Sequence, residues 1–114
     1  MSEPILIRND ELGEIDTSAD GFSPAAELKA GVGYCLMTRN DGTAVGVASL
    51  QVSPSGGEDA DEWYDLTGTE LPVDGTGNTN VWNVERSMYP YVRVKYVSTS
   101  DTGTMTCNIS VKSN

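Results

Sequence analysis

The sequence predicts an all-β fold, an antiparallel β-sandwich or jelly-roll-like single domain, on three observations. Short apolar segments that alternate with polar residues recur along the chain, as in half-buried strands. Clusters of Gly, Asn, Asp and Ser separate these segments, and such clusters favour tight turns. No stretch of about 11 residues shows a convincing helical period. The chain has 114 residues, enough for one domain over residues 1–114 with a real core.

The N-terminal part is the least regular. We expect residues 4–8 to form a short strand or arm and residues 9–25 an acidic surface loop with at most one short strand, so that residues 1–25 form an arm and loop on the domain. The apolar segment Ile5, Leu6 and Ile7 has two interpretations: it pairs with the sheet edge of a partner, or it is the first strand of the chain's own sheet. Residues 25–30 form one helical turn or enter a strand.

The remaining strands are bounded by turn signals at residues 40–42, 67–68, 74–80 and 100–103, with a polar loop over 54–62. We expect strands at residues 33–39, 44–53, 63–66, 81–84, 91–98 and 104–112. Alternation assigns the faces. The residues expected to face inward are Leu50, Val52, Val92, Val94, Tyr96, Met105, Cys107, Ile109 and Val111, and those expected to face outward are Ser49, Gln51, Ser53, Tyr91, Arg93 and Lys95.

The charge balance and the missing residue types exclude several functions. The net charge is -10, so the chain lacks the cationic footprint that nucleic acid or an anionic membrane surface requires. Histidine is absent, which excludes Ser-His-Asp catalysis and His-ligated metal. We therefore expect no enzyme activity, no cofactor and no metal. The N-terminus lacks the pattern of a secretory signal, so a complete chain stays in the cell that makes it.

Three motifs favour ordinary structural roles. Asp101-Thr102-Gly103 is the triplet of aspartic proteases, but it lies between two expected strands near the C-terminus, so a hairpin turn is the better interpretation. The acidic residues of the 58–65 segment could offer oxygen ligands to Ca²⁺, but their spacing is not that of a calcium loop, and we expect a solvated surface. Cys35 and Cys107 lie in separate strands, and we expect two buried free thiols; a disulfide would require the two strands to be neighbours with suitable Cβ geometry.

The aromatic residues divide between core and surface. We expect Trp63 and Trp82 in the core. Tyr91 and Arg93 share the outward face of one strand, and aromatic and Arg side chains commonly anchor protein interfaces. The candidate interface residues are Ile5, Leu6, Ile7, Arg86, Tyr89, Tyr91 and Arg93. No other set of residues forms a plausible site.

The residue order from Ser49 to the C-terminus resembles a strand pattern of small virion proteins of tailed bacteriophages. The matching pieces are Trp63-Tyr64-Asp65-Leu66, the segment from Tyr89 to Tyr96, and the segment from Gly103 to Val111. This is a pattern of strands and turns and not a catalytic signature.

The resemblance implies a capsid decoration (cement) protein. Such proteins bind the outer surface of an assembled head and clamp neighbouring major capsid subunits, singly or as dimers or trimers. It implies the major capsid protein as partner and the virion as location, after synthesis in the host bacterial cytoplasm. We then expect Arg93→Glu to weaken assembly more than folding. The alternatives are a phage tail or fibre attachment module and a carbohydrate-binding β-sandwich with exposed Trp or Tyr rings.

Overall fold

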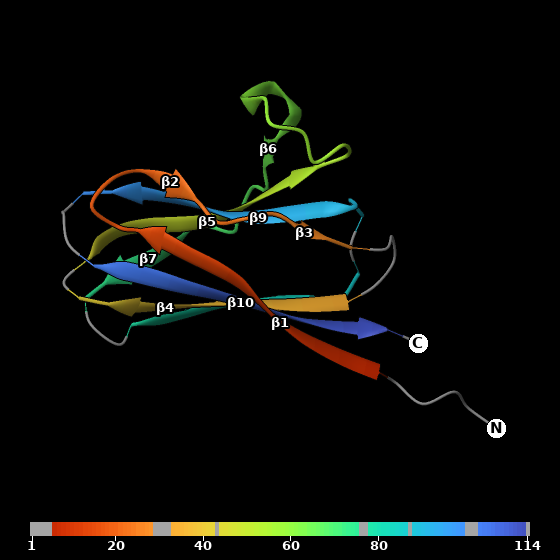
Figure 1. The fold of residues 1–114 in the computed structure, drawn as a ribbon, viewed down its shortest axis with the longest axis horizontal. Helices are drawn as coiled ribbons and strands as arrows, with labels where there is room; N and C mark the ends of the chain where they lie inside the picture. The colour runs from red at the N-terminus through yellow and green to blue at the C-terminus, as the bar shows by residue number, and fades with distance from the viewer. Residues whose placement is uncertain are drawn as a thin grey trace.

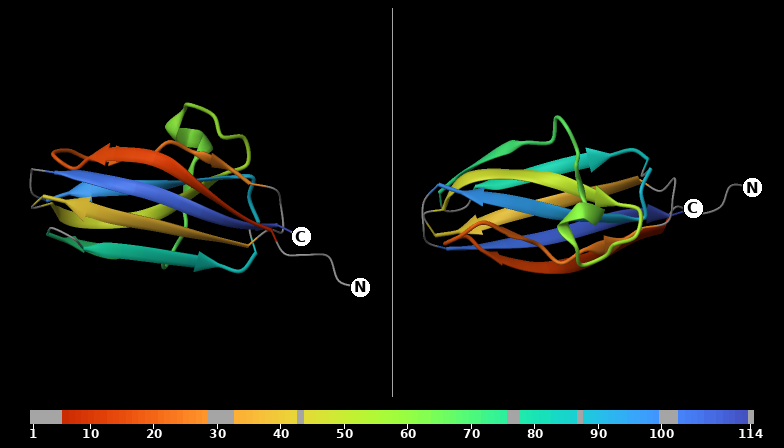
Figure 2. Two further views of the ribbon diagram at one scale, coloured as in Figure 1. Left: turned by 60° about the horizontal axis from the view of Figure 1, so that its bottom comes forward. Right: turned by 90° about the horizontal axis from the view of Figure 1, so that it is seen from above.

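The chain folds as a sandwich of two antiparallel sheets, as the sequence predicts (Figures 1 and 2). The computed structural model describes residues 6–28, 33–42, 44–75, 78–86, 88–99 and 103–113. Within these ranges the strands are β1 (Leu6–Asp16), β2 (Gly21–Phe22), β3 (Ala26–Glu27), β4 (Gly33–Asp41), β5 (Val45–Ser53), β6 (Tyr64–Asp65), β7 (Leu71–Asp74), β8 (Thr79–Val84), β9 (Tyr91–Ser98) and β10 (Thr104–Ser113), with one 3-10 turn, η1 (Ala60–Glu62).

Sheet A has the strand order β1-β10-β4-β8, and sheet B has the order β2-β9-β5-β6. In sheet B, β3 also pairs with β9, and β7 also pairs with β5. All of these pairings are antiparallel. No helix in the described part of the chain is long and apolar enough to cross a membrane.

The core lies between the two sheets and is filled by the alternate residues of each strand. Every residue expected to face inward is buried. The most enclosed apolar side chains come from both layers, among them Leu36, Met105 and Ile109 from sheet A and Leu50 and Tyr96 from sheet B. The tyrosine is the largest of the fully buried side chains, and its hydroxyl donates to the carbonyl oxygen of Val45 at 3.0 Å. Its one polar atom is therefore paired, as burial requires.

The prediction of an acidic loop over residues 9–25 is wrong for residues 9–16. Residues 9–16 continue β1, which pairs with β10 along its whole length. The register shifts between Glu11 and Gly13, and this irregularity interrupts the two-residue period that identifies a strand in sequence. Leu6 and Ile7 pair with Ser113 and Lys112, so they belong to the chain's own sheet, which was one of the two interpretations.

Two further boundaries differ from the sequence prediction. The strand β7 was not expected, because it contains Pro72, but proline is tolerated where no ladder donor is needed. Asn40 and Asp41 end β4 instead of forming a turn, and the chain turns after them at Gly42, whose φ is 104°. Asn40 is buried and donates to the Asn78 side chain at 3.4 Å. The described part of the 25–30 segment enters a strand, because residues 26–27 form β3. The Asp101-Thr102 pair lies outside the described residues.

Candidate functional site

The outer face of sheet B carries the most distinctive group of side chains in the described structure. Its two long strands, β5 and β9, are paired so that Gln51 lies opposite Arg93, Ser49 opposite Lys95 and Val47 opposite Val97. The short strand β6 extends this row, because Asp65 pairs with Gln51. The register thus lines up side chains from three strands that are distant in sequence.

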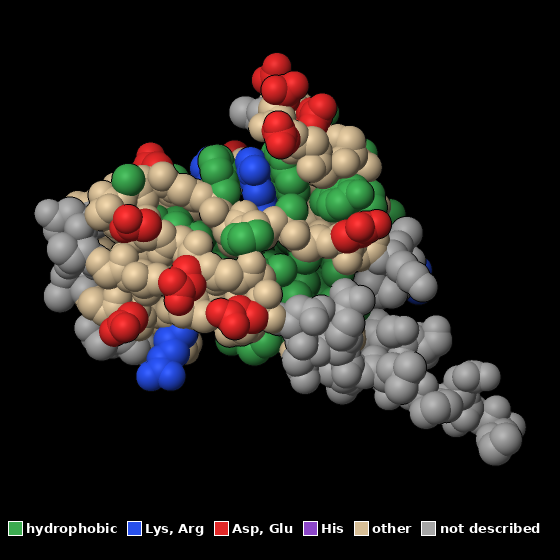
Figure 3. Space-filling model, in the orientation of Figure 1, with side chains coloured by type: hydrophobic (Ala, Val, Ile, Leu, Met, Phe, Trp, Pro, Cys, Tyr) green, Lys and Arg blue, Asp and Glu red, His purple; other side chains and the backbone are tan. Residues whose placement is uncertain are grey.

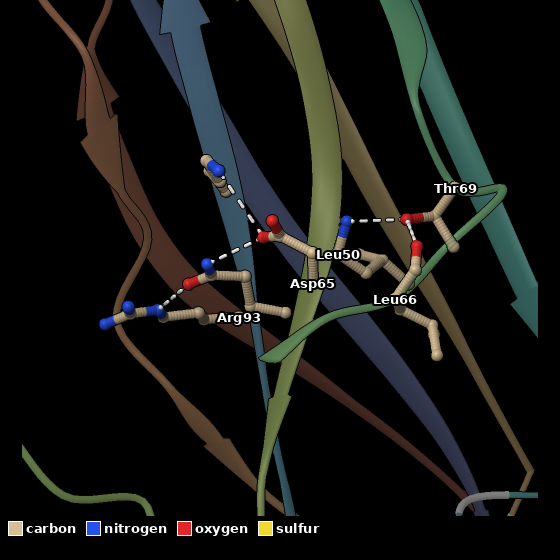
Figure 4. A network of polar contacts seen from close by, with 7 residues as sticks. Leu50, Asp65, Leu66, Thr69 and Arg93 are labelled. Atoms are coloured by element: carbon tan, nitrogen blue, oxygen red, sulfur yellow. Dashed lines mark hydrogen bonds and ion pairs between the residues drawn. The ribbon is translucent and has the colours of Figure 1, made fainter. Parts of the chain in front are cut away.

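A chain of hydrogen bonds crosses these three strands (Figure 4). The Arg93 Nε donates to Gln51 Oε1 at 2.9 Å, and Gln51 Nε2 donates to Asp65 Oδ1 at 2.9 Å. Lys95 Nζ lies 3.4 Å from the same Asp65 oxygen. Gln51 is buried and uses both ends of its amide, so it fixes the position of the arginine and the carboxylate together.

The guanidinium of Arg93 also lies between two aromatic rings. Its Cζ atom is 3.8 Å from the centroid of the Phe22 ring and 4.1 Å from the centroid of the Trp63 ring. Both distances are well within the range of cation–π attraction. We call Phe22, Arg93 and Trp63 the arginine stack. Because the stack joins β2, β9 and the loop that precedes β6, it ties a loop and an edge strand to the centre of sheet B.

The loop of residues 54–63 projects from sheet B in Figure 1 and is held at several points. The Trp63 indole donates to the Gly57 carbonyl oxygen at 2.8 Å, inside the loop itself. Gly56 has a φ of 67°, and a Cβ atom there would lie 2.7 Å from the Tyr91 ring. Glycine is therefore required at this point, where the loop backbone meets the side chain of β9. The loop is braced against the sheet by Tyr91 and Arg93.

The electrostatics of the site keep its charged groups ionised. The hydrogen bond from Gln51 lowers the pKa of Asp65, and the ammonium of Lys95 lowers it further. Partial burial lowers the pKa of Arg93, but a guanidinium stays protonated throughout the physiological range. The site therefore holds a fixed positive charge between two rings and a paired carboxylate beside it.

An apolar surface adjoins the hydrogen-bonded row on the same face. Val45, Val47 and Val97 are 40%, 41% and 40% exposed, and Pro72, which pairs with Val47, is exposed beside them. We call Val45, Val47, Pro72 and Val97 the valine patch. Clustered aliphatic groups on the face of a rigid sheet are typical of a protein-binding surface, whereas single exposed apolar residues are not.

The acidic side chains are concentrated elsewhere on the surface that Figure 3 displays. They cover the front, where β1 lies, and the tip of the projecting loop. Below the loop, basic side chains lie directly beside hydrophobic ones. On the outer face of sheet B, Arg93 and Lys95 place two basic side chains beside the single carboxylate of Asp65, in a chain whose net charge is -10.

The structure brings together only part of the interface expected from sequence. Tyr91 and Arg93 lie on the outer face of sheet B, as predicted, although both contact the 54–63 loop. Tyr89 and Arg86 are exposed in the connection between β8 and β9. Leu6 and Ile7 belong to sheet A, in the other layer, and Ile5 lies outside the described residues. The set is therefore not one patch.

The remaining site expectations have mixed outcomes. Trp63 and Trp82 are 7% and 6% exposed, so both are buried as predicted and neither offers a flat ring to a sugar. Cys107 is buried and free, and burial raises the pKa of its thiol to about 12. Cys35 is also free but only half-buried, because it lies on the outer face of sheet A, so the prediction of two buried thiols is wrong for this residue.

Several site residues were missed by sequence reasoning. Phe22 lay in the segment assigned to a loop, and Trp63 was assigned to the core without a partner. Alternation along residues 44–53 did carry a signal for Val45 and Val47, because it places them on the same face as Gln51. No local signal predicts the approach of Phe22 and Trp63 to Arg93, since the three residues are distant in sequence. Among the described residues, no group of three or more His, Cys, Asp or Glu side chains is placed to hold a metal.

These features define an antiparallel β-sandwich domain with a braced loop and an apolar patch on one sheet. No family model matches the chain, and no curated protein matches it. Among solved structures it is similar to the K1 cleaved adhesin domain of Lys-gingipain from Porphyromonas gingivalis W83, with 15% identity, a TM-score of 0.60, and coverage of 89% of this chain and 73% of that one. It is also similar to the SPBc2 prophage-derived protein YomS, with 14% identity, a TM-score of 0.59, and coverage of 99% and 98%. At these identities the likeness establishes the fold.

Proposed function

We propose that this chain is a non-enzymatic structural module of a tailed-phage particle. It binds the outer surface of the assembled head and stabilises contacts between major capsid subunits, after synthesis in the host bacterial cytoplasm. The observation that carries the proposal is the valine patch beside the arginine stack on sheet B. A rigid sheet face with exposed aliphatic groups and a fixed cation suits docking onto another protein.

The size of the patch limits how tightly one copy binds. Complete burial of a valine side chain stabilises a complex by about 2 kcal/mol, and about 40% of each side chain is still exposed to be buried. The three valines together then contribute about 2 to 3 kcal/mol. This is too little for a stable complex, because the loss of translational and rotational freedom on association costs more free energy than the three valines contribute. Docking therefore needs the loop and the basic side chains as well, and many copies on one particle would act together.

Three further observations support a role in phage assembly. The likeness to a prophage-derived protein extends over almost the whole of both chains, so the two have the same single-domain size. The strand pattern from Ser49 onward resembles that of small virion proteins. The absence of histidine from the sequence removes the most common general base. The buried state of Trp63 and Trp82 removes the two indole rings as stacking platforms for the carbohydrate-binding alternative, which leaves only tyrosine rings such as Tyr64 for that role.

The test is co-sedimentation of the purified protein with phage heads that lack it. We expect saturable binding at a fixed ratio to the major capsid subunit. Val47→Lys places a charge in the valine patch and should weaken this binding at least tenfold, because it leaves a desolvated ammonium in the interface. Asn108→Lys is the matched control, since it adds the same charge to an exposed position of β10 on sheet A.

The outcomes separate the candidate functions. Saturable binding that Val47→Lys weakens and Asn108→Lys does not would support head docking through sheet B. Equal weakening by both variants would reject this face as the docking surface. No binding at concentrations of about 100 µM would reject the head as partner, and the same two variants would then be tested on tails and fibres.

A further inference from the structure

The strand β8 forms an open edge of sheet A. It is the last strand in the order β1-β10-β4-β8, and among the described residues of that sheet it pairs only with β4. In both views of Figure 2, β8 lies at the boundary of the molecule. Side chains on its inner side contact β7 and the residues just before it: Asn80 Nδ2 donates to the Pro72 carbonyl of β7 at 3.0 Å, and Trp82 Nε1 donates to the Thr69 carbonyl at 2.6 Å. These contacts hold β8 in place without occupying its backbone edge.

The register determines which backbone groups of β8 face outward. The Asn40 N–H donates to the Asn78 carbonyl oxygen at 2.9 Å, so the residue pair 40 and 78 is a hydrogen-bonded pair of this ladder. Such pairs recur at every second residue in an antiparallel ladder. The backbone groups of Asn80 and Trp82 therefore point toward β4, and those of Thr79, Val81 and Asn83 point away from it, along the free edge.

The other edge strands carry features that prevent pairing with another molecule, and β8 carries none of them. The strand β1 has a bulge and exposed carboxylates at Glu11, Glu14 and Asp16. The strands β2, β3 and β6 have two residues each, and β7 is a four-residue strand that contains proline. The strand β8 has six residues with no charge, no proline and no bulge. Bulges, charges, proline and short length are the usual protections of an edge.

We propose that β8 pairs with β8 of a second copy of this chain, antiparallel, about a two-fold axis through Val81. In this register Val81 faces Val81, and Thr79 faces Asn83 of the other copy. These are the three residues whose backbone groups face the free edge, so every pair is a hydrogen-bonded one. Val81 is 55% exposed on the outer face of the sheet, and its contact with its own copy would bury part of that area.

The neutrality of β8 allows a second copy of this acidic chain to pair at this edge. Two chains of net charge -10 repel each other, so they associate only where their contact brings few carboxylates together. The strand β8 is neutral, whereas β1, the other long edge, would place acidic groups opposite acidic groups. Pairing also joins the two A sheets into one continuous sheet and removes both open edges. This proposal does not depend on the proposed function, because it uses the sheet opposite the valine patch.

The proposed pairing of two β8 strands is weak because it buries a small area. One strand pair buries much less than the roughly 1,200 Å² of a standard stable interface. We expect a dissociation constant on the order of 100 µM, so dimers form where the local concentration is high. Copies held close together on a larger assembly would meet this condition.

Sedimentation velocity from about 10 µM to 1 mM tests the pairing. We expect the sedimentation coefficient of the wild-type chain to rise toward that of a dimer. Val81→Lys places two ammonium groups opposite each other at the axis and should weaken association at least tenfold. Val47→Lys is the matched control, because Val47 has similar exposure but lies on β5, which is paired on both sides.

Amide hydrogen exchange on the wild-type chain gives a readout that does not depend on a variant folding. The amides of Thr79, Val81 and Asn83 should exchange more slowly at high concentration, whereas those of Asn80 and Trp82 should change little. A chain that stays monomeric at about 1 mM would overturn the proposal. So would equal weakening by Val81→Lys and Val47→Lys, or concentration-dependent protection that is confined to strands other than β8. Loss of head binding in Val47→Lys with dimerisation intact would show that the two surfaces are separate.

Discussion

Replacement of Arg93 by alanine tests whether the arginine stack holds the projecting loop on sheet B. The substitution removes two ring contacts, at 3.8 and 4.1 Å, and the hydrogen bond to Gln51 at 2.9 Å. A partly buried cation–π contact stabilises a fold by about 1 kcal/mol, and a hydrogen bond from a charged donor by about 1.5 kcal/mol. Because Gln51 is buried, its Oε1 atom also loses its partner. We expect a loss of about 2 to 4 kcal/mol in the free energy of unfolding.

Urea denaturation followed by tryptophan fluorescence measures this loss. A decrease of 2 to 4 kcal/mol corresponds to a fall of about 1 to 2 M in the midpoint for a domain of this size. Hydrogen exchange in the 54–63 loop should accelerate in the same variant, because Trp63 loses the cation against which it packs. Arg93→Lys is the control: it keeps the charge but loses the planar stack, so we expect a smaller shift.

If Arg93→Ala moves the midpoint by less than about 0.3 M and leaves exchange in the loop unchanged, the stack does not brace the loop. The sequence-based expectation that Arg93→Glu weakens assembly more than folding also changes. The new carboxylate would lie near Asp65 and lack both ring contacts, so part of any assembly loss would reflect a damaged fold. Val47→Lys is therefore the better probe of docking.

Three further predictions concern the 54–63 loop, the loss of stability at acid pH, and the two cysteine thiols. Gly56→Ala should destabilise the fold by about 1 to 3 kcal/mol in urea denaturation, because its φ is 67° and the new Cβ would meet the Tyr91 ring; an unchanged midpoint would contradict the tight approach. The pKa of Asp65 is lower in the folded chain than its ordinary value of 3.8. Its ionised form therefore stabilises the fold at pH values above 3.8, and this stabilisation is lost as the pH falls through the pKa of the folded chain. The difference in urea midpoint between the wild type and Asp65→Asn should thus be largest near neutral pH and shrink in acid, and a constant difference would disprove this linkage. Because burial raises the pKa of Cys107 to about 12, a disulfide reagent at about pH 8 should label Cys35 and spare Cys107 until the chain unfolds; fast labelling of the folded Cys35→Ser variant would show that the core thiol is accessible.

Much of the fold could be predicted from local pattern. In β5, β9 and β10 every residue expected to face inward is buried, although Gln51 and Ser53 of β5, which were expected to face outward, are buried as well. In contrast, β1 is a polar edge strand with an irregularity between Glu11 and Gly13, and β7 contains Pro72. Both lack a clear two-residue period, so only their pairing partners define them as strands.

The candidate site depends on contacts that no local pattern encodes. Composition and the two-residue period of a strand are enough to predict the class of fold, the charge, the absence of histidine and the outward direction of Tyr91 and Arg93. The enclosure of Arg93 by Phe22 and Trp63, and the position of β8 as the unprotected edge, could be found only from the folded structure. The physical reason is that strand order and register bring distant residues together, and these depend on how all the strands pack at once.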